Sequence, residues 1–129
     1  MLDELLSKQA EVISKVAEDK TANSLGVYAI SRPDTHKIIY VGKTKTKSIQ
    51  GRMKDHLQHK HGDTDSDLAN MVIKREKLPQ NYSDYLVRYL SINEPRDRMR
   101  FEMFAISVLD PALNKDDNKA PLKRKWMKY

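Results

Sequence analysis

The sequence contains no cysteine among its 129 residues. The absence of cysteine excludes disulfides, zinc–thiolate sites and thiol nucleophiles, and it is typical of proteins from a reducing cytoplasm. No apolar run is long enough to span a bilayer, and the first four residues lack the basic segment that opens a secretory signal. We therefore expect a soluble cytoplasmic protein with no membrane partner.

The chain is also too short for two hydrophobic cores of similar size. A chain of this length forms one domain, which buries roughly two thirds of the surface that the extended chain exposes. Lysine and arginine number 24 against 18 acidic residues, so the formal net charge is +6. A basic chain favours a polyanionic partner such as nucleic acid, although charge alone does not identify one.

Apolar residues recur at helical spacing in the first segment, with charged and amide residues between them. They are Leu2, Leu5, Leu6, Val12, Ile13 and Val16. This pattern predicts one amphipathic helix within residues 1–22. The apolar face either packs on the chain's own domain or forms the contact of a homodimer or higher homo-oligomer.

Two short apolar runs, residues 25–31 and 38–41, flank the turn-forming sequence Arg32-Pro33-Asp34-Thr35 and predict a β-hairpin. Ser48 then suits the N-cap of a helix. In that helix Arg52 and His56 are four residues apart and share one face. The adjacent apolar face consists of Ile49, Met53 and Leu57.

The second half predicts a surface loop over residues 59–65, a helix from about 65 to 76 and a third strand over 85–92. Pro95 suits the first turn of another helix, which ends at Asp110-Pro111. Its apolar residues predict a buried stripe with Glu102 beside it rather than within it. The stripe consists of Met99, Met103, Ile106 and Leu109.

Several unrelated residue types follow one another in a defined order between about residue 25 and residue 114. Two strand-like tripeptides come first, then a lysine, an arginine and histidine four apart, a glutamate and an asparagine: Gly26-Val27-Tyr28, Tyr40-Val41-Gly42, Lys43, Arg52, His56, Glu102 and Asn114. This order resembles the active site of the GIY-YIG nucleases. Val27 and Val41 stand where the name sequence has isoleucine, a β-branched exchange that suits a strand equally well.

The resemblance implies an α+β domain over residues 23–118, in which helices cover a three-stranded, mainly antiparallel sheet. The helix of residues 1–22 and a basic tail of residues 119–129 are additions to it. The implied activity is endonucleolytic cleavage of double-stranded DNA, in a bacterial or phage-infected bacterial cell. The small size is typical of a stand-alone phage or restriction enzyme, and the loop of residues 58–67 is then the expected place for specificity determinants.

The resemblance also implies roles for the site residues. Tyr28 accepts the proton of the attacking water, Arg52 holds the scissile phosphate, and Glu102 binds a single Mg²⁺ or Mn²⁺ ion. Tyr40 orients water or phosphate, and His56 assists through a hydrogen bond. Asn114 supports the site residues without contacting the substrate itself. Lys43 contacts a phosphate or favours the ionised form of a nearby tyrosine.

The expected DNA contacts are basic residues near the site and in the tail, together with one tryptophan of the tail. They are Lys43, Lys45, Lys47, Lys54, Lys123, Arg124, Lys125 and Trp126. Basic residues around an aromatic ring suit backbone contact and base stacking, but the tail is equally explained as a solubilising segment. A catalytically inactive module of the same fold, which binds nucleic acid without cutting it, is the alternative to the enzyme.

Overall fold

The structure, a computed structural model, describes residues 1–58 and 82–114. Its centre is a four-stranded antiparallel sheet with the strand order β1-β4-β2-β3. The strands are β1 (Glu11–Val12), β2 (Gly26–Ser31), β3 (Ile38–Lys43) and β4 (Leu86–Ser91). The expected α+β class is confirmed, whereas the expected count of three strands is wrong because β1 adds a fourth.

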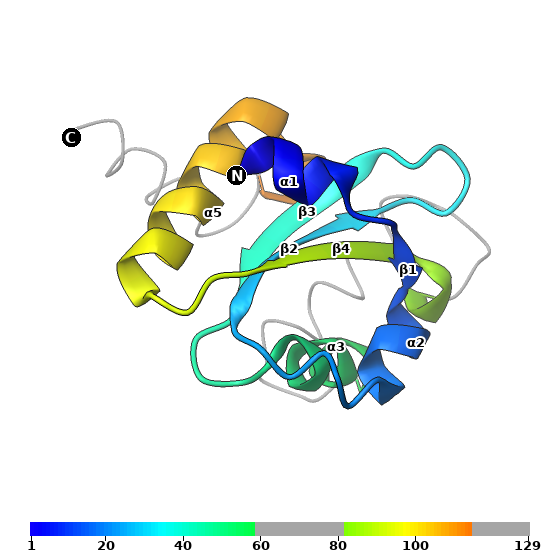
Figure 1. Ribbon diagram of the computed structural model, residues 1–129. Helices are drawn as coiled ribbons and strands as arrows, with labels where there is room; N and C mark the ends of the chain where they lie inside the picture. Colours follow the sequence, from blue (N-terminus) through cyan, green and yellow to red (C-terminus); the bar gives the residue numbers. More distant parts are fainter. Residues whose placement is uncertain (59–81, 115–129) are drawn as a thin grey trace.

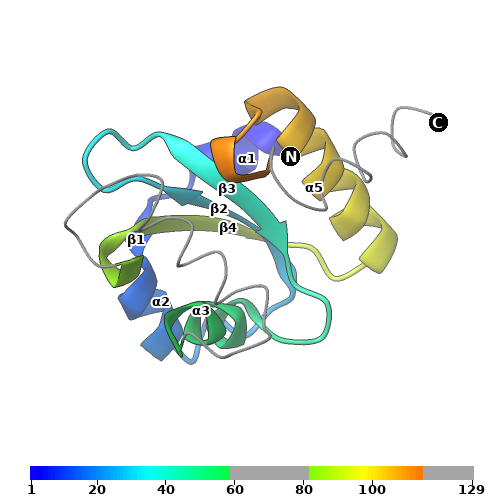
Figure 2. The same ribbon diagram turned by 180° about the vertical axis from the view of Figure 1, so that it is seen from behind.

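Helices cover both faces of the sheet, as Figure 1 shows, and Figure 2 gives the same arrangement from behind. One face carries α1 (Leu2–Ser7) and α5 (Pro95–Leu109), and the other carries α2 (Ile13–Glu18) and α3 (Ile49–Gln58). Two short 3-10 turns complete the described part, η1 (Tyr82–Asp84) and η2 (Ala112–Asn114). No helix within residues 1–58 and 82–114 is long and apolar enough to cross a bilayer.

The central strand β2 separates two apolar clusters. Tyr28 and Ile30 point into the cluster under α2 and α3, and Val27 and Ala29 into the cluster under α1 and α5. All six residues of β2 are buried, because the strand has a neighbour on each side and helices on each face. Its side chains alternate between the faces, as in any strand, so successive residues of the same motif reach different clusters.

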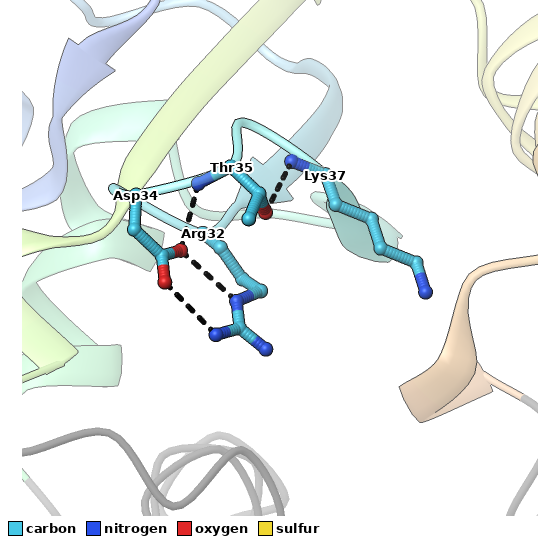
Figure 3. A network of polar contacts seen from close by, with 4 residues as sticks. All are labelled: Arg32, Asp34, Thr35 and Lys37. Atoms are coloured by element: carbon cyan, nitrogen blue, oxygen red, sulfur yellow. Dashed lines mark hydrogen bonds and ion pairs between the residues drawn. The ribbon is translucent and has the colours of Figure 1, made fainter.

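The predicted hairpin is confirmed, and β2 pairs with β3 in antiparallel register. Its turn is held by an ion pair between Arg32 and Asp34 at 3.0 Å, and the Asp34 carboxylate also accepts from the Thr35 amide (Figure 3). The hydrogen bond from Arg32 lowers the pKa of the Asp34 carboxyl to about 2. His36 has a left-handed backbone with φ of 63° and completes the reversal of the chain.

The prediction of one N-terminal helix is wrong. The chain leaves α1 at Lys8, whose backbone is extended, forms β1 against β4, and begins α2 at Ile13. Contacts distant in sequence favour this break, because the Arg88 Nε donates to the Lys8 carbonyl at 2.9 Å and the Ile13 amide donates to the Tyr85 carbonyl at 2.8 Å. Leu5 and Ile13 are fully buried in the chain's own core, which supports the first of the two explanations of this segment.

The predictions for α3, β4 and the ends of α5 are confirmed. The Ser48 hydroxyl accepts from the Gly51 amide at 3.1 Å, as an N-cap does. Glu94 caps α5 by accepting from the Asp97 amide at 2.9 Å, and hydrogen bonds from main-chain amides lower the pKa of this carboxyl. The helix ends at Asp110, which has a left-handed backbone with φ of 49°.

The prediction that Glu102 lies beside the buried face of α5 is wrong, although Ile106 and Leu109 of the predicted stripe do pack against the core. Met99 is 41% exposed, and Met103, Ile106 and Leu109 are only partly buried. The fully buried residues of this helix are instead Arg98, Phe101, Glu102 and Ala105. Their spacing is helical, so the inner face is rotated relative to the apolar stripe and includes two charged side chains.

Four other predictions lie outside the described residues: the loop of residues 59–65, the specificity determinants of residues 58–67 (apart from residue 58), the helix of residues 65–76 and the tail of residues 119–129.

Candidate active site

The two tyrosines of the tripeptides meet around Gly42. Tyr28 lies opposite Gly42 in the pairing of β2 with β3. A β-carbon placed on Gly42 would lie 2.6 Å from the Tyr28 hydroxyl oxygen and 2.8 Å from a ring carbon of Tyr40. The Tyr28 ring therefore crosses the edge strand β3 at the one residue without a side chain, and its hydroxyl is placed against that strand.

Three polar side chains surround the Tyr28 hydroxyl on the α3 face and form a cluster with it. The His56 Nε2 lies 3.1 Å from the hydroxyl oxygen, and the Arg52 Nε donates to it at 3.5 Å. The Tyr40 ring is tilted against the Tyr28 ring, with centroids 6.3 Å apart. Tyr28 and His56 are buried, whereas Tyr40 and Arg52 are half-buried, so the cluster reaches the surface through the last two.

Gly42 thus has a steric role that can be tested. In Gly42→Ala the added methyl would overlap the buried Tyr28 ring, and we expect a loss of about 1–3 kcal/mol in the free energy of unfolding. Denaturant unfolding measures this loss. Gly51→Ala is the matched control, because the nearest atom to a β-carbon there is the Ser48 Oγ at 3.5 Å and alanine favours the helix. Equal stability of the two variants would contradict the packing of Tyr28 on Gly42.

Lys43 and Glu102 meet on the opposite face of the same edge strand. Lys43 pairs with Val27, whose side chain points into the cluster under α5. The Lys43 Nζ lies 4.0 Å from the Glu102 Oε1. The Glu102 side chain is only 2% exposed, whereas that of Lys43 is 22% exposed. Because Gly42 and Lys43 are consecutive, the end of β3 joins the tyrosine cluster on one face to the carboxylate on the other.

Asn114 binds the outer edge of β3 at Val41, the middle residue of the second tripeptide. The Val41 amide donates to the Asn114 Oδ1 at 2.8 Å, and the Asn114 Nδ2 donates to the Val41 carbonyl at 2.9 Å. Asn114 is 3% exposed. It holds the backbone between Tyr40 and Gly42, a location that suits the supporting role expected of it.

The lysines that the sequence assigns to DNA contact differ in their surroundings. Lys45 is exposed two residues beyond Lys43, and Lys54 is exposed on α3. Lys47 is also exposed but forms an ion pair with Asp55, a buried carboxylate of α3 that the sequence did not single out. The tail residues Lys123, Arg124, Lys125 and Trp126 lie outside the described residues.

Sequence reasoning also missed Arg98, whose guanidinium is buried beside the end of β3 and bonds to main-chain carbonyls there. The available signal was its place four residues before Glu102, since residues four apart share a helical face. If Glu102 lies on the buried face of α5, then Arg98, one turn earlier, lies on that face as well.

The donor set near Glu102 suits one kind of metal site. Within residues 1–58 and 82–114, no three histidine, cysteine or acidic side chains come together to hold an ion. Magnesium usually keeps several waters and binds through one or two carboxylates plus the phosphates of a substrate. A single buried carboxylate at the edge of the sheet fits that mode, and it does not fit an all-protein cage.

Comparison with known families gives one match. The family model described as the GIY-YIG catalytic domain matches residues 24–115. The search of curated proteins and the search of solved structures each found no match. The matched segment is well over half of the chain and spans Tyr28, Tyr40, Arg52, Glu102 and Asn114. The chain therefore belongs to the GIY-YIG family of nucleases.

Proposed function

We propose that this protein is a divalent-metal-dependent endonuclease that hydrolyses phosphodiester bonds of double-stranded DNA. The observation that carries the proposal is the arrangement at the end of β3. There the hydroxyl of Tyr28 contacts His56 and Arg52, and Glu102 lies across the same strand beside Lys43. Nucleases of this family generally depend on a divalent metal.

Tyr28 is the proposed general base. Its hydroxyl oxygen accepts a hydrogen bond from Arg52, and this cationic donor favours the ionised phenol. His56 Nε2 is within reach of the phenol proton at 3.1 Å. In the proposed step the phenol passes its proton to His56 as its oxygen takes a proton from the attacking water.

Arg52 and Lys43 are the proposed phosphate contacts. Hydrolysis places additional negative charge on the phosphate, and preorganised cationic donors stabilise that charge. Arg52 is half-buried and already directed at the Tyr28 hydroxyl, which brings the phosphate and the base together. The exposed Lys45 and Lys54 extend the positive surface along the DNA backbone, and we propose the same role for the basic tail.

Glu102 is the proposed metal ligand. A bound Mg²⁺ or Mn²⁺ ion would stabilise the charge that develops on the leaving oxygen. Tyr40 orients the water or phosphate from the half-buried edge of the cluster, and Asn114 fixes the backbone that carries Tyr40.

Supercoiled plasmid provides the direct test. We expect the purified protein to convert it to open-circle or linear DNA with Mg²⁺, to stop with EDTA, and to resume when Mg²⁺ is restored in excess. Protein that carries Tyr28→Phe and Glu102→Gln together, purified in parallel, controls for contaminating nucleases. DNA that is bound but never cut under these conditions would refute the enzyme and support the inactive binding module.

A further inference from the structure

Arg98 has a set of contacts that the proposed chemistry does not use. Arg98 is 5% exposed, and its guanidinium donates to four main-chain carbonyls. The distances are 3.1 Å to Thr44, 3.4 Å to Lys45, 3.0 Å to Ile92 and 2.7 Å to Asn93. A buried charge is costly unless its donors are satisfied, and the rigid fork of arginine suits several acceptors at once.

The four carbonyls belong to two separate loops. Thr44 and Lys45 directly follow β3, whereas Ile92 and Asn93 connect β4 to α5. Arg98 therefore fastens the first turns of α5 to the end of β3. Thr44 is also held from its other side, because its amide donates to the Gly26 carbonyl and its hydroxyl accepts from the Gly26 amide, both at 2.9 Å.

Glu102 follows Arg98 by one helical turn on the same buried face of α5. Because Arg98 holds this part of α5 against the end of β3, it also helps to place the Glu102 carboxylate. Lys43, the neighbour of Glu102, is the residue immediately before Thr44. The contacts of Arg98 thus link the helix that carries the proposed metal ligand to the end of the strand that carries the proposed phosphate contact.

We propose that Arg98 is a positioning residue for DNA cleavage, which acts by holding α5 in register with the end of β3. The proposal rests on the function proposed above. It differs from a general contribution to folding in one respect: loss of Arg98 lowers the rate of cleavage in protein that is still folded and still binds DNA.

Arg98→Ala and Arg98→Lys test the proposal against Arg100→Ala, an exposed arginine of the same helix whose loss changes the charge equally. We expect single-turnover cleavage by Arg98→Ala to fall on the order of 100-fold, the effect of a small misplacement of reacting groups. DNA affinity should change only as much as in Arg100→Ala. Methylguanidinium should partly restore the Arg98→Ala rate, and methylammonium should not. A cleavage rate equal to that of Arg100→Ala would overturn the proposal.

Amide hydrogen exchange gives a second measurement that needs no activity. In Arg98→Ala the Thr44 and Gly26 amides should exchange faster, while the Tyr28 and Tyr89 amides of the central ladder keep their protection. Arg98→Lys retains the charge and serves if the alanine variant does not fold. Unchanged exchange at Thr44 overturns the proposal. If the wild-type protein cuts no DNA, the proposed function is wrong. The exchange data then show by themselves whether Arg98 holds the loop of Thr44 and Lys45.

Discussion

The Glu102→Gln protein should bind DNA and leave it uncut in the presence of Mg²⁺. The amide keeps the shape of the carboxylate but is a poor ligand for a hard divalent cation. Glu102 is almost completely buried beside Lys43. Metal stabilisation of the transition state amounts to several kcal/mol, which corresponds to a loss of roughly 1000-fold or more in rate.

Single-turnover cleavage of supercoiled plasmid over a range of Mg²⁺ concentrations measures this loss. Glu18→Gln is the matched control, since Glu18 is exposed on α2 and undergoes the same chemical change. Thermal unfolding of both variants separates a loss of chemistry from a loss of structure, and DNA binding is compared in EDTA. Magnesium-stimulated cleavage by Glu102→Gln at the rate of Glu18→Gln would remove Glu102 from the site.

The Tyr28→Phe protein should lose about 100- to 10,000-fold in the cleavage step, the range in which positioned general bases contribute. This change deletes one oxygen atom and leaves the ring on Gly42. His56 loses its contact at 3.1 Å and Arg52 its contact at 3.5 Å. Tyr40→Phe is the comparison, and we expect a smaller loss from it because Tyr40 is assigned an orienting role only.

The pH dependence of the wild-type rate tests the same role. A free phenol ionises near pH 10 and is therefore almost fully protonated at neutral pH. In the proposed step its proton moves to His56, so the rate should rise with pH as the tyrosine–histidine pair loses a proton. Tyr28→Phe should remove that slope. A Tyr28→Phe protein with the wild-type rate and slope would show that the water is activated without Tyr28.

The hairpin and α3 were predictable because local chemistry determines them. Turn formers separate two β-branched runs, and the helical spacing of Arg52 and His56 puts both on the face adjacent to the apolar one. The structure brings both side chains to the Tyr28 hydroxyl. No local pattern, however, reveals that the ring of Tyr28 extends over Gly42, since this depends on the register of two strands.

The N-terminal segment was mispredicted because its structure depends on residues far along the chain. Its helical periodicity is genuine in both halves, yet β4 offers a strand partner at Glu11 and Val12, and Arg88 binds the carbonyl of Lys8. Tertiary contacts of this kind override helical preference. The sequence contains the partners but does not indicate that they meet.

The phase of α5 was mispredicted for a different reason. Choosing the face with most apolar residues assumes that charged side chains point outward. Here Arg98 and Glu102 point inward, and Met99, Phe104 and Val108 are exposed. Buried charge of this kind is typical of sites with a chemical task, so the proposed metal ligand is the residue that led the prediction away from the correct face.

The pair of hydrogen bonds between Asn114 and Val41 also affects how the protein behaves at high concentration. β3 is the last strand of the sheet, and unpaired main-chain groups at such an edge invite strand-to-strand association between copies. The asparagine amide satisfies the donor and the acceptor that Val41 would otherwise offer to another strand. Asn114 thus blocks strand addition at the middle of this edge and helps to protect the protein against aggregation.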